Sequence, residues 1–378
     1  MELNPSSKLK NYEIPIFSNY ILDGRKKIKS DEDTDIYCGI EKNTKEKVIF
    51  KLKKNNYFDY HYIFKESLIY KELAGIKRIP KMYEVGKQGE YSILITELLG
   101  PSLKMLLESV GGTFSLATTL KVCTQVLKIV KTIHKKGVVL RYLKPSNMVI
   151  GRDENKNYIY LIDFEIAKKY IKNGEHIPFS EDKLIKGNRH YISINTHNEL
   201  EISRRDDIES LGYNLIYFMK GKLPWSHIYD SDMILDKKID TNLDVLCEGL
   251  PEEFKEFIKY ARELEFEQEP DYNYLKKLLI KAGEKNGIDI DKVKYDWEIK
   301  KEEIKKENKN LKEQKKIIQN NKIKEDEVIN EKELIIEDEI IKANENEKLK
   351  KYRKINEDSN EKKIKTMIGK KKRKTKFE

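Results

Sequence analysis

The feature that most constrains the fold is a change of hydrophobic periodicity along the chain. Within residues 20–53, apolar and polar side chains alternate in short runs between charged turns, which is typical of antiparallel strands. Residues 61–74 switch to helical spacing, and strand-like runs return at 81–85 and 91–98. Helical patterns then dominate, at 102–109, 115–136 and 206–220. The chain is therefore predicted to be α+β, with a small β-rich lobe containing one main helix followed by a larger helical lobe.

The end of the chain differs in composition from the rest. Residues 298–378 hold 26 Lys and Arg and 19 Asp and Glu and lack proline, so we expect a long charged helix, frayed or partly disordered. Apolar residues recur every seven positions at Ile304, Leu311 and Ile318, but Glu325 interrupts the series. Because a coiled coil needs about three to four heptads with two apolar seams, a solvated single helix is favoured over a self-associating coil.

Charge and cysteine content narrow the cellular setting. The tail supplies seven of the ten net positive charges, and its block Lys370–Lys376 is compatible with nuclear import or with an anionic surface such as nucleic acid. Cys38, Cys123 and Cys247 are too widely spaced for a metal site and are predicted to be free thiols. No apolar leader or membrane-spanning run is found, so we expect an intracellular protein, cytoplasmic and/or nuclear.

Four short motifs occur in the order and spacing of the protein-kinase signature set. They are a lysine closing an apolar strand, a glutamate on the next helix, the loop Arg-Tyr-Leu-Lys-Pro-Ser-Asn and an Asp-Phe pair, at Lys51, Glu66, 141–147 and 163–164. A single match would be weak, but four in register within a two-lobed outline predict a protein-kinase fold.

Other segments resemble the casein kinase 1 family of protein kinases in particular. They are Glu-Leu-Leu-Gly-Pro-Ser-Leu, Ser-Ile-Asn-Thr-His, Ser-Arg-Arg-Asp-Asp-Ile-Glu-Ser-Leu-Gly-Tyr, Leu-Pro-Trp and Pro-Asp-Tyr-Asn-Tyr-Leu, at 97–103, 193–197, 203–213, 223–225 and 270–275. The resemblance covers residues 12–297, with an N-lobe at about 12–99 and a C-lobe at about 100–297. The tail, 298–378, lies outside it.

The resemblance implies ATP and Mg²⁺ as cofactors and protein Ser/Thr as the acceptor. It places Lys144 near the γ-phosphate and Asp207 beneath the catalytic loop, and it assigns magnesium to Asn147 and Asp163, whose oxygens suit that ion. Without the resemblance, an Asp and an Asn in loops are more often turn residues. The residues implied for ATP binding are Lys51, Glu66, Glu97, Leu99, Val149 and Ile162.

The catalytic loop departs from the family at the residue that matters most for the reaction. Tyr142 stands where the family has the aspartate that orients the substrate hydroxyl and accepts its proton. A phenol has a pKa near 10, so it is neutral at pH 7 and donates more readily than it accepts. Ser146 also replaces an aspartate just before Asn147. Losing a general base costs on the order of 10²–10⁴ in rate, and Tyr142 is expected to be non-functional as one.

The nucleotide side departs from the family as well. The phosphate-covering loop, 29–35, has no glycine and presents Asp31, Glu32 and Asp33, whereas the family pattern lets backbone N–H groups approach the phosphates. A solvated acidic hairpin turn is the favoured interpretation of that loop, and in either case the loop is not expected to serve ATP. Ile49 falls where the family keeps a small alanine above the purine ring, so a close-packed slot must shift or fill.

These losses favour a casein kinase 1-like pseudokinase that acts as a binding, scaffold or regulatory module. One alternative is an active serine/threonine kinase that transfers the ATP γ-phosphate to a protein substrate. A second alternative is a binding arm for nucleic acid or a protein partner, formed by the tail on an inert body. Weak ATP and Mg²⁺ binding, or none, is equally compatible with the sequence.

Overall fold

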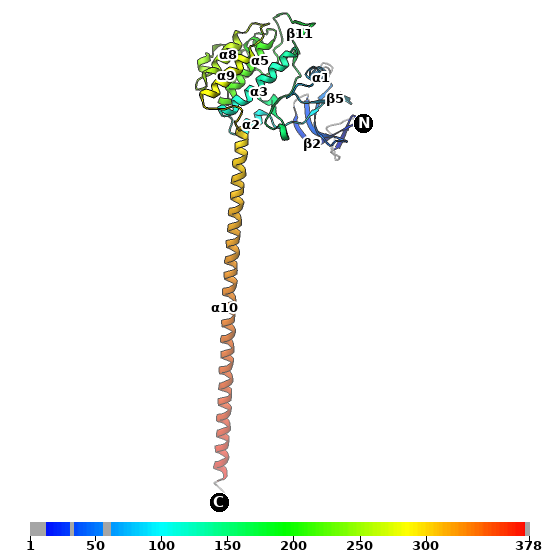
Figure 1. The fold of residues 1–378 in the computed structure, drawn as a ribbon. Helices are drawn as coiled ribbons and strands as arrows, with labels where there is room; N and C mark the ends of the chain where they lie inside the picture. The colour runs from blue at the N-terminus through cyan, green and yellow to red at the C-terminus, as the bar shows by residue number, and fades with distance from the viewer. Residues whose placement is uncertain (1–12, 31–33, 56–61, 375–378) are drawn as a thin grey trace. The chain divides into compact units, whose positions relative to one another are not determined.

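The computed structural model describes residues 13–30, 34–55 and 62–374. It divides into two compact units, residues 1–300 and 301–378, which are described separately. The first unit contains a β-rich lobe followed by a helical lobe (Figure 1), so the predicted α+β order is confirmed.

The β-rich lobe is a six-stranded antiparallel sheet with strand order β1-β2-β3-β4-β6-β5. Helix α1 connects β4 to β5 and is the only helix of this lobe in the described chain. The elements are β1 Glu13–Ile16, β2 Tyr20–Ser30, β3 Thr34–Glu41, β4 Lys47–Lys54, α1 Tyr62–Glu72, β5 Met82–Gln88 and β6 Tyr91–Glu97. The predicted acidic turn Asp31–Asp33 lies outside the described residues.

Strand β4 sets the position of the first site residue. Its residues Val48, Phe50 and Leu52 are buried in the core of the sheet, together with Ile93 and Ile95 of β6. Because successive side chains of a strand point to opposite faces, Ile49, Lys51 and Lys53 share the other face. The sheet core therefore fixes two lysines side by side on the face away from it.

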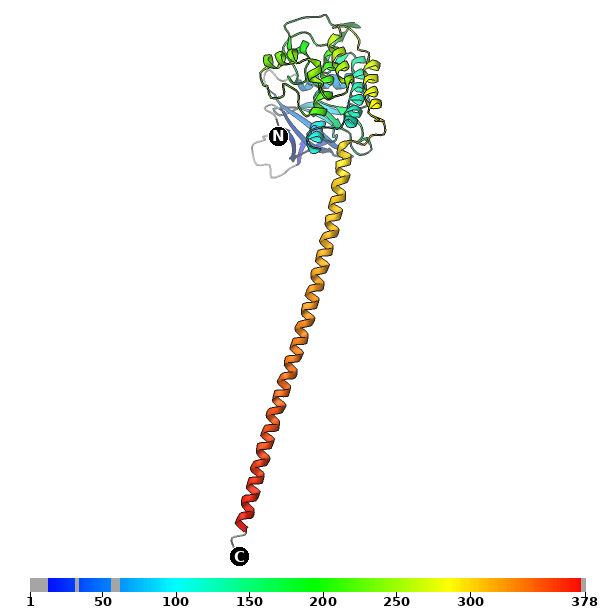
Figure 2. The same cartoon turned by 90° about the vertical axis from the view of Figure 1, so that its left-hand side faces the viewer.

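The helical lobe follows β6. Figures 1 and 2 show from two directions that α3, α5, α8 and α9 gather on one side of this unit, with the sheet on the other. Its helices are α2 Leu103–Ser109, α3 Leu116–Lys135, α4 Ile194–His197, α5 Arg204–Lys220, α6 Ser231–Asp240, α7 Leu243–Leu246, α8 Glu252–Glu263 and α9 Tyr272–Lys285. Short strands lie between α3 and α4, namely β7 Val138–Val139, β8 Met148–Ile150, β9 Ile159–Leu161, β10 Lys168–Lys169, β11 Ile171–Lys172 and β12 Glu175–His176.

The last helix, α10 Asp296–Lys374, begins inside the first unit. The Asp296 carboxylate accepts hydrogen bonds from the backbone N–H and the hydroxyl of Ser115, at 2.6 and 2.7 Å. The Trp297 ring stacks on Tyr295 with centroids 4.2 Å apart and contacts Phe114. The first turn of α10 is thus anchored to the start of α3.

The second unit is the remainder of α10. The described side chains of residues 301–366 are exposed, including those of Ile304, Leu311 and Ile318. Side chains beyond residue 366, and with them the basic block Lys370–Lys376, lie outside the described ones. Among the described residues, no helix combines the length and the apolar character that crossing a bilayer requires.

Candidate active site

The predicted lysine–glutamate pair is present at the junction of the two lobes. Lys51 Nζ on β4 lies 2.8 Å from Glu66 Oε2 on α1. The other oxygen of Glu66 accepts a hydrogen bond from the backbone N–H of Phe164, at 3.1 Å. Glu66 is 1% exposed. A buried carboxylate must be paired, and here a single glutamate joins the sheet, α1 and the segment after β9.

Lys51 contacts two further carboxylates. Its Nζ lies 3.1 Å from Asp163 Oδ1 and 2.9 Å from Glu165 Oε2. Burial by itself would lower the pKa of the Lys51 ammonium, but the carboxylates of Glu66, Asp163 and Glu165 outweigh burial and raise that pKa well above its ordinary value. Lys51 is therefore charged at neutral pH and contacts three carboxyl groups.

Glu165 is a site residue that the sequence interpretation missed. Besides Lys51, it binds Lys53, whose Nζ lies 2.9 Å from Glu165 Oε1. Burial would raise the pKa of Glu165, but the charges and hydrogen bonds of Lys51 and Lys53 prevail and lower it to about 2. The signals available were a glutamate directly after Phe164 and a lysine two places after Lys51. Neither showed that the two side chains meet.

The two predicted magnesium ligands lie in one small pocket, which also contains Tyr142 and Ile162. Asp163 has a backbone φ of 67°, a left-handed conformation that is uncommon for a non-glycine residue. The Asn147 side-chain amide donates to the backbone carbonyl of Tyr142, at 3.2 Å. The catalytic-loop and Asp-Phe motifs therefore meet at one pocket.

Tyr142 lines this pocket with its half-buried phenol. Burial and the nearby Asp163 carboxylate raise the pKa of Tyr142, so the hydroxyl stays protonated at neutral pH. Lys144 Nζ lies 3.7 Å from the centre of the Tyr142 ring, a cation–π contact. The described pocket wall thus presents a neutral phenol at the predicted base position, and Asp163 is the one carboxylate in that wall.

Asp207 supports the loop from below, as predicted. Its carboxylate accepts hydrogen bonds from the backbone N–H groups of Leu140 and Arg141, at 2.7 and 2.8 Å. Its Oδ2 also lies 2.8 Å from His134 Nε2 on α3. Asp207 is 1% exposed, so these three contacts replace the water that it loses on burial.

The predicted adenine-side residues are more dispersed. Ile162 lines the pocket beside Asp163, whereas Val149 is a buried residue of β8. The Glu97 carboxylate accepts a hydrogen bond from the backbone N–H of Lys81 at 3.1 Å, and Leu99 follows β6 in a half-buried position. Ile49 pairs with Thr96 across β4 and β6, as its place in the strand requires.

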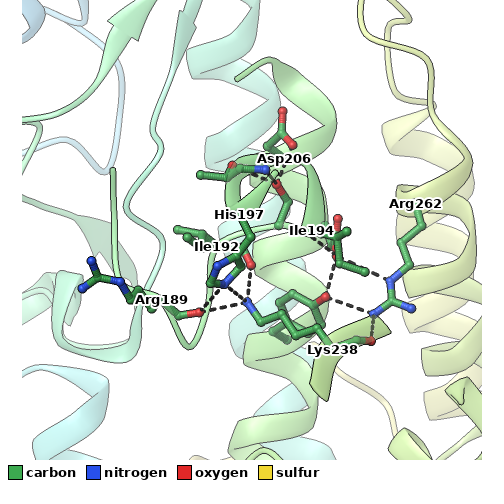
Figure 3. A network of polar contacts seen from close by, with 11 residues as sticks. Arg189, Ile192, Ile194, His197, Asp206, Lys238 and Arg262 are labelled. Atoms are coloured by element: carbon green, nitrogen blue, oxygen red, sulfur yellow. Dashed lines mark hydrogen bonds and ion pairs between the residues drawn. The ribbon is translucent and has the colours of Figure 1, made fainter. Parts of the chain in front are cut away.

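A buried lysine holds the segment that precedes α5 (Figure 3). Lys238 Nζ on α6 donates to the backbone carbonyls of Arg189 and Ile192, at 2.9 and 2.5 Å, and lies 3.2 Å from His197 Nε2. Lys238 has no exposed surface, and burial lowers its pKa to about 7. In Figure 3 the Arg189 guanidinium points away from this network while its carbonyl takes part in it. The same segment is tied to α5, because the Ser193 hydroxyl donates to Asp206 at 2.6 Å.

Replacing this lysine should loosen the segment. Lys238→Met keeps much of the aliphatic bulk but removes the donor of the buried Ile192 carbonyl and one contact of the Arg189 carbonyl, so we expect unfolding to become easier by about 1–3 kcal/mol. Lys237→Met is the matched control, because Lys237 is the adjacent, exposed lysine of α6 and such changes stay within about 0.5 kcal/mol. Hydrogen exchange should accelerate at residues 189–197 in Lys238→Met alone. Equal exchange in both variants would contradict this role.

The residues at Lys51 do not suit nucleotide phosphates as they stand. The Glu165 carboxylate bridges Lys51 and Lys53, so a phosphate reaching these ammonium groups meets an anion already bound to them. The oxygens of Glu66, Asp163 and Glu165 lie within 4.8 Å of one another, a spacing that suits a divalent cation. The Lys51 ammonium, however, already supplies the positive charge among them.

The family model of the protein kinase domain matches residues 30–275. The match covers most of the sheet, the whole of the pocket, and the segment that Lys238 holds.

Proposed function

The chain belongs to the protein kinase family, and we propose that it is a casein kinase 1-like member that lacks efficient phosphotransfer and works as a binding, scaffold or regulatory module. The observation that carries this proposal is the Tyr142 phenol at the base position of the pocket. Its partner is a protein, as expected for this family. The contacts retained at Glu66 and Asp207 support a rigid domain of the kinase type rather than one that has lost its internal framework.

The reaction explains why Tyr142 decides the matter. Phosphoryl transfer depends on positioning and charge neutralisation, and the loop aspartate holds the acceptor hydroxyl in line and takes its proton. A phenol with a raised pKa holds its own proton at neutral pH and offers a donor where an acceptor is needed. Asp163, the carboxylate beside it, is engaged by Lys51. No second carboxylate among the described pocket residues takes over the task.

A second candidate function is an active serine/threonine kinase with an unusual loop. The observation that favours it is the intact set of Lys51, Glu66 and Asp163, with Lys51 Nζ 2.8 and 3.1 Å from the two carboxylates. This arrangement holds the nucleotide-facing residues of both lobes together. On this view Lys51 and Asp163 would hold ATP and Mg²⁺ once Glu165 is displaced, and catalysis is slowed rather than lost.

One assay separates the two functions. The full-length chain is incubated with labelled ATP, Mg²⁺ and casein, and phosphate incorporated into casein and into the chain itself is counted. We expect the wild type to incorporate no more phosphate than Asp163→Ala. Both proteins lack the base of the catalytic loop, so the Asp163 carboxylate that the wild type keeps should make no difference. Incorporation by the wild type that Asp163→Ala abolishes would establish the active kinase instead.

A further inference from the structure

Glu165 bridges the two lysines of β4 with both of its oxygens. Oε2 lies 2.9 Å from Lys51 Nζ, and Oε1 lies 2.9 Å from Lys53 Nζ. The three side chains are mostly buried, with 22% of Glu165, 13% of Lys51 and 10% of Lys53 exposed. Such a two-point contact is stronger and more directional than a surface ion pair, because both ends are shielded from water.

The fold holds this bridge in place from both sides. Lys51 and Lys53 share one face of β4 because Phe50 and Leu52 are buried on the other. Lys53 Nζ also lies 4.5 Å from the centre of the Tyr62 ring at the start of α1. Glu165 follows Phe164, whose N–H is bonded to Glu66. The contact between the β4 lysines and Glu165 therefore forms without any change in β4 or in the segment after Phe164.

The bridge has the chemistry of an anion-binding site that is already filled. Two adjacent ammonium groups would attract the oxygens of a phosphate, and the two carboxylate oxygens of Glu165 satisfy both ammonium groups instead. Lys51 and Lys53 with Glu66, Asp163 and Glu165 carry a formal charge of −1, so the cluster repels a further anion. With a neutral residue at 165, the cluster would carry no net charge.

We propose that Glu165 is an internal ligand of the β4 lysines that competes with the phosphates of a nucleotide. The proposal deepens the proposed function and rests on it: the domain keeps Lys51 and Glu66 joined without nucleotide, and a nucleotide must displace Glu165 to reach them. The obstacle acts on phosphate groups rather than on the base and sugar. Discrimination against a nucleotide therefore increases with its number of phosphates.

The test is equilibrium binding to the full-length chain, by titration calorimetry with adenosine, AMP, ADP and ATP, each in EDTA and in Mg²⁺. Glu165→Gln keeps the shape of the side chain and removes its charge, so we expect ATP in EDTA to bind at least about tenfold more tightly than to the wild type. The gain should shrink from ATP to AMP and vanish for adenosine. Glu90→Gln, on an exposed glutamate of the same lobe, should change nothing.

Two further variants serve as controls for the gain in ATP affinity. Glu165→Gly should reproduce the gain, so a folding defect of one variant does not decide the outcome. In Glu165→Gln combined with Lys53→Met the gain should fall, because the phosphate then lacks one of its two cations. In these variants the gain in nucleotide affinity should depend on the charge of the phosphates. A gain caused by a change in packing alone would not depend on that charge.

Several outcomes would overturn the proposal. They are no gain for ATP in either Glu165 variant, an equal gain for adenosine, or tighter ATP binding by the wild type in Mg²⁺ than by Glu165→Gln, which would make Glu165 a metal ligand. Phosphate transfer by the wild type would overturn the proposed function and leave this binding order intact. A flat binding order would overturn the inference and leave the proposed function intact.

Discussion

Asp207→Ala is expected to lower the free energy of unfolding of the domain by about 3–5 kcal/mol. The Asp207 carboxylate accepts from the backbone N–H groups of Leu140 and Arg141 and contacts His134, and alanine supplies no acceptor for any of them. Each buried donor left without a partner costs about 1–3 kcal/mol. For a domain of this size such a loss lowers the melting temperature by about 5–8 °C, which thermal denaturation detects.

Two comparisons make that prediction specific. Asp207→Asn keeps one carbonyl acceptor, so its loss should be smaller than that of the alanine variant. Asp236→Ala removes an exposed carboxylate on α6 and should change unfolding by no more than about 0.5 kcal/mol. If Asp207→Ala and Asp236→Ala had the same melting temperature, the hydrogen bonds at Leu140 and Arg141 would contribute little to the stability of the fold.

Part of this site could be predicted because it is encoded locally. Alternation along 47–54 requires Lys51 to lie opposite Phe50, and the helical spacing of 61–74 places Glu66 on a single helix. The motif order then brings these residues to Asp163 and Asn147. Asp207 could be predicted for the same reason, since it lies in a helix whose family pattern is legible. These inferences needed the residue types and spacing, without atomic detail.

The contacts that the sequence did not show depend on tertiary placement. Glu165 lies 114 positions from Lys51, and the two meet only because the fold brings the segment after β9 next to β4. Lys237 and Lys238 are adjacent and identical in type, but the first is exposed and the second fully buried. Which lysine faces the core depends on where α6 packs. The apolar pattern of this ten-residue helix of mixed polarity is too weak to predict which of the two lysines faces the core.

The remaining prediction concerns the reaction itself. Tyr142→Asp combined with Glu165→Gly should raise phosphate transfer to casein on the order of 10²–10⁴-fold over the wild type. The aspartate supplies an acceptor for the substrate hydroxyl, and the glycine frees Lys51 and Lys53 from their internal carboxylate. The rate of phosphate incorporation at a fixed ATP concentration below saturation, with Mg²⁺, measures the gain. Ser146 and the loop at 29–35 stay unchanged, so the rescued rate should remain below that of an intact kinase.

The single variants show whether the two changes act on the same step. Tyr142→Asp alone should gain less than the double variant, because ATP still has to displace Glu165, and Glu165→Gly alone should bind nucleotide without transferring phosphate. The double variant should therefore transfer phosphate faster than Tyr142→Asp alone. Adding Asp163→Ala should return the double variant to background, whereas Tyr229→Asp, at a 91% exposed tyrosine, should leave the wild-type rate unchanged. If Tyr142→Asp alone gave the full rate, Glu165 would be no barrier to the nucleotide, and the base would be the sole defect.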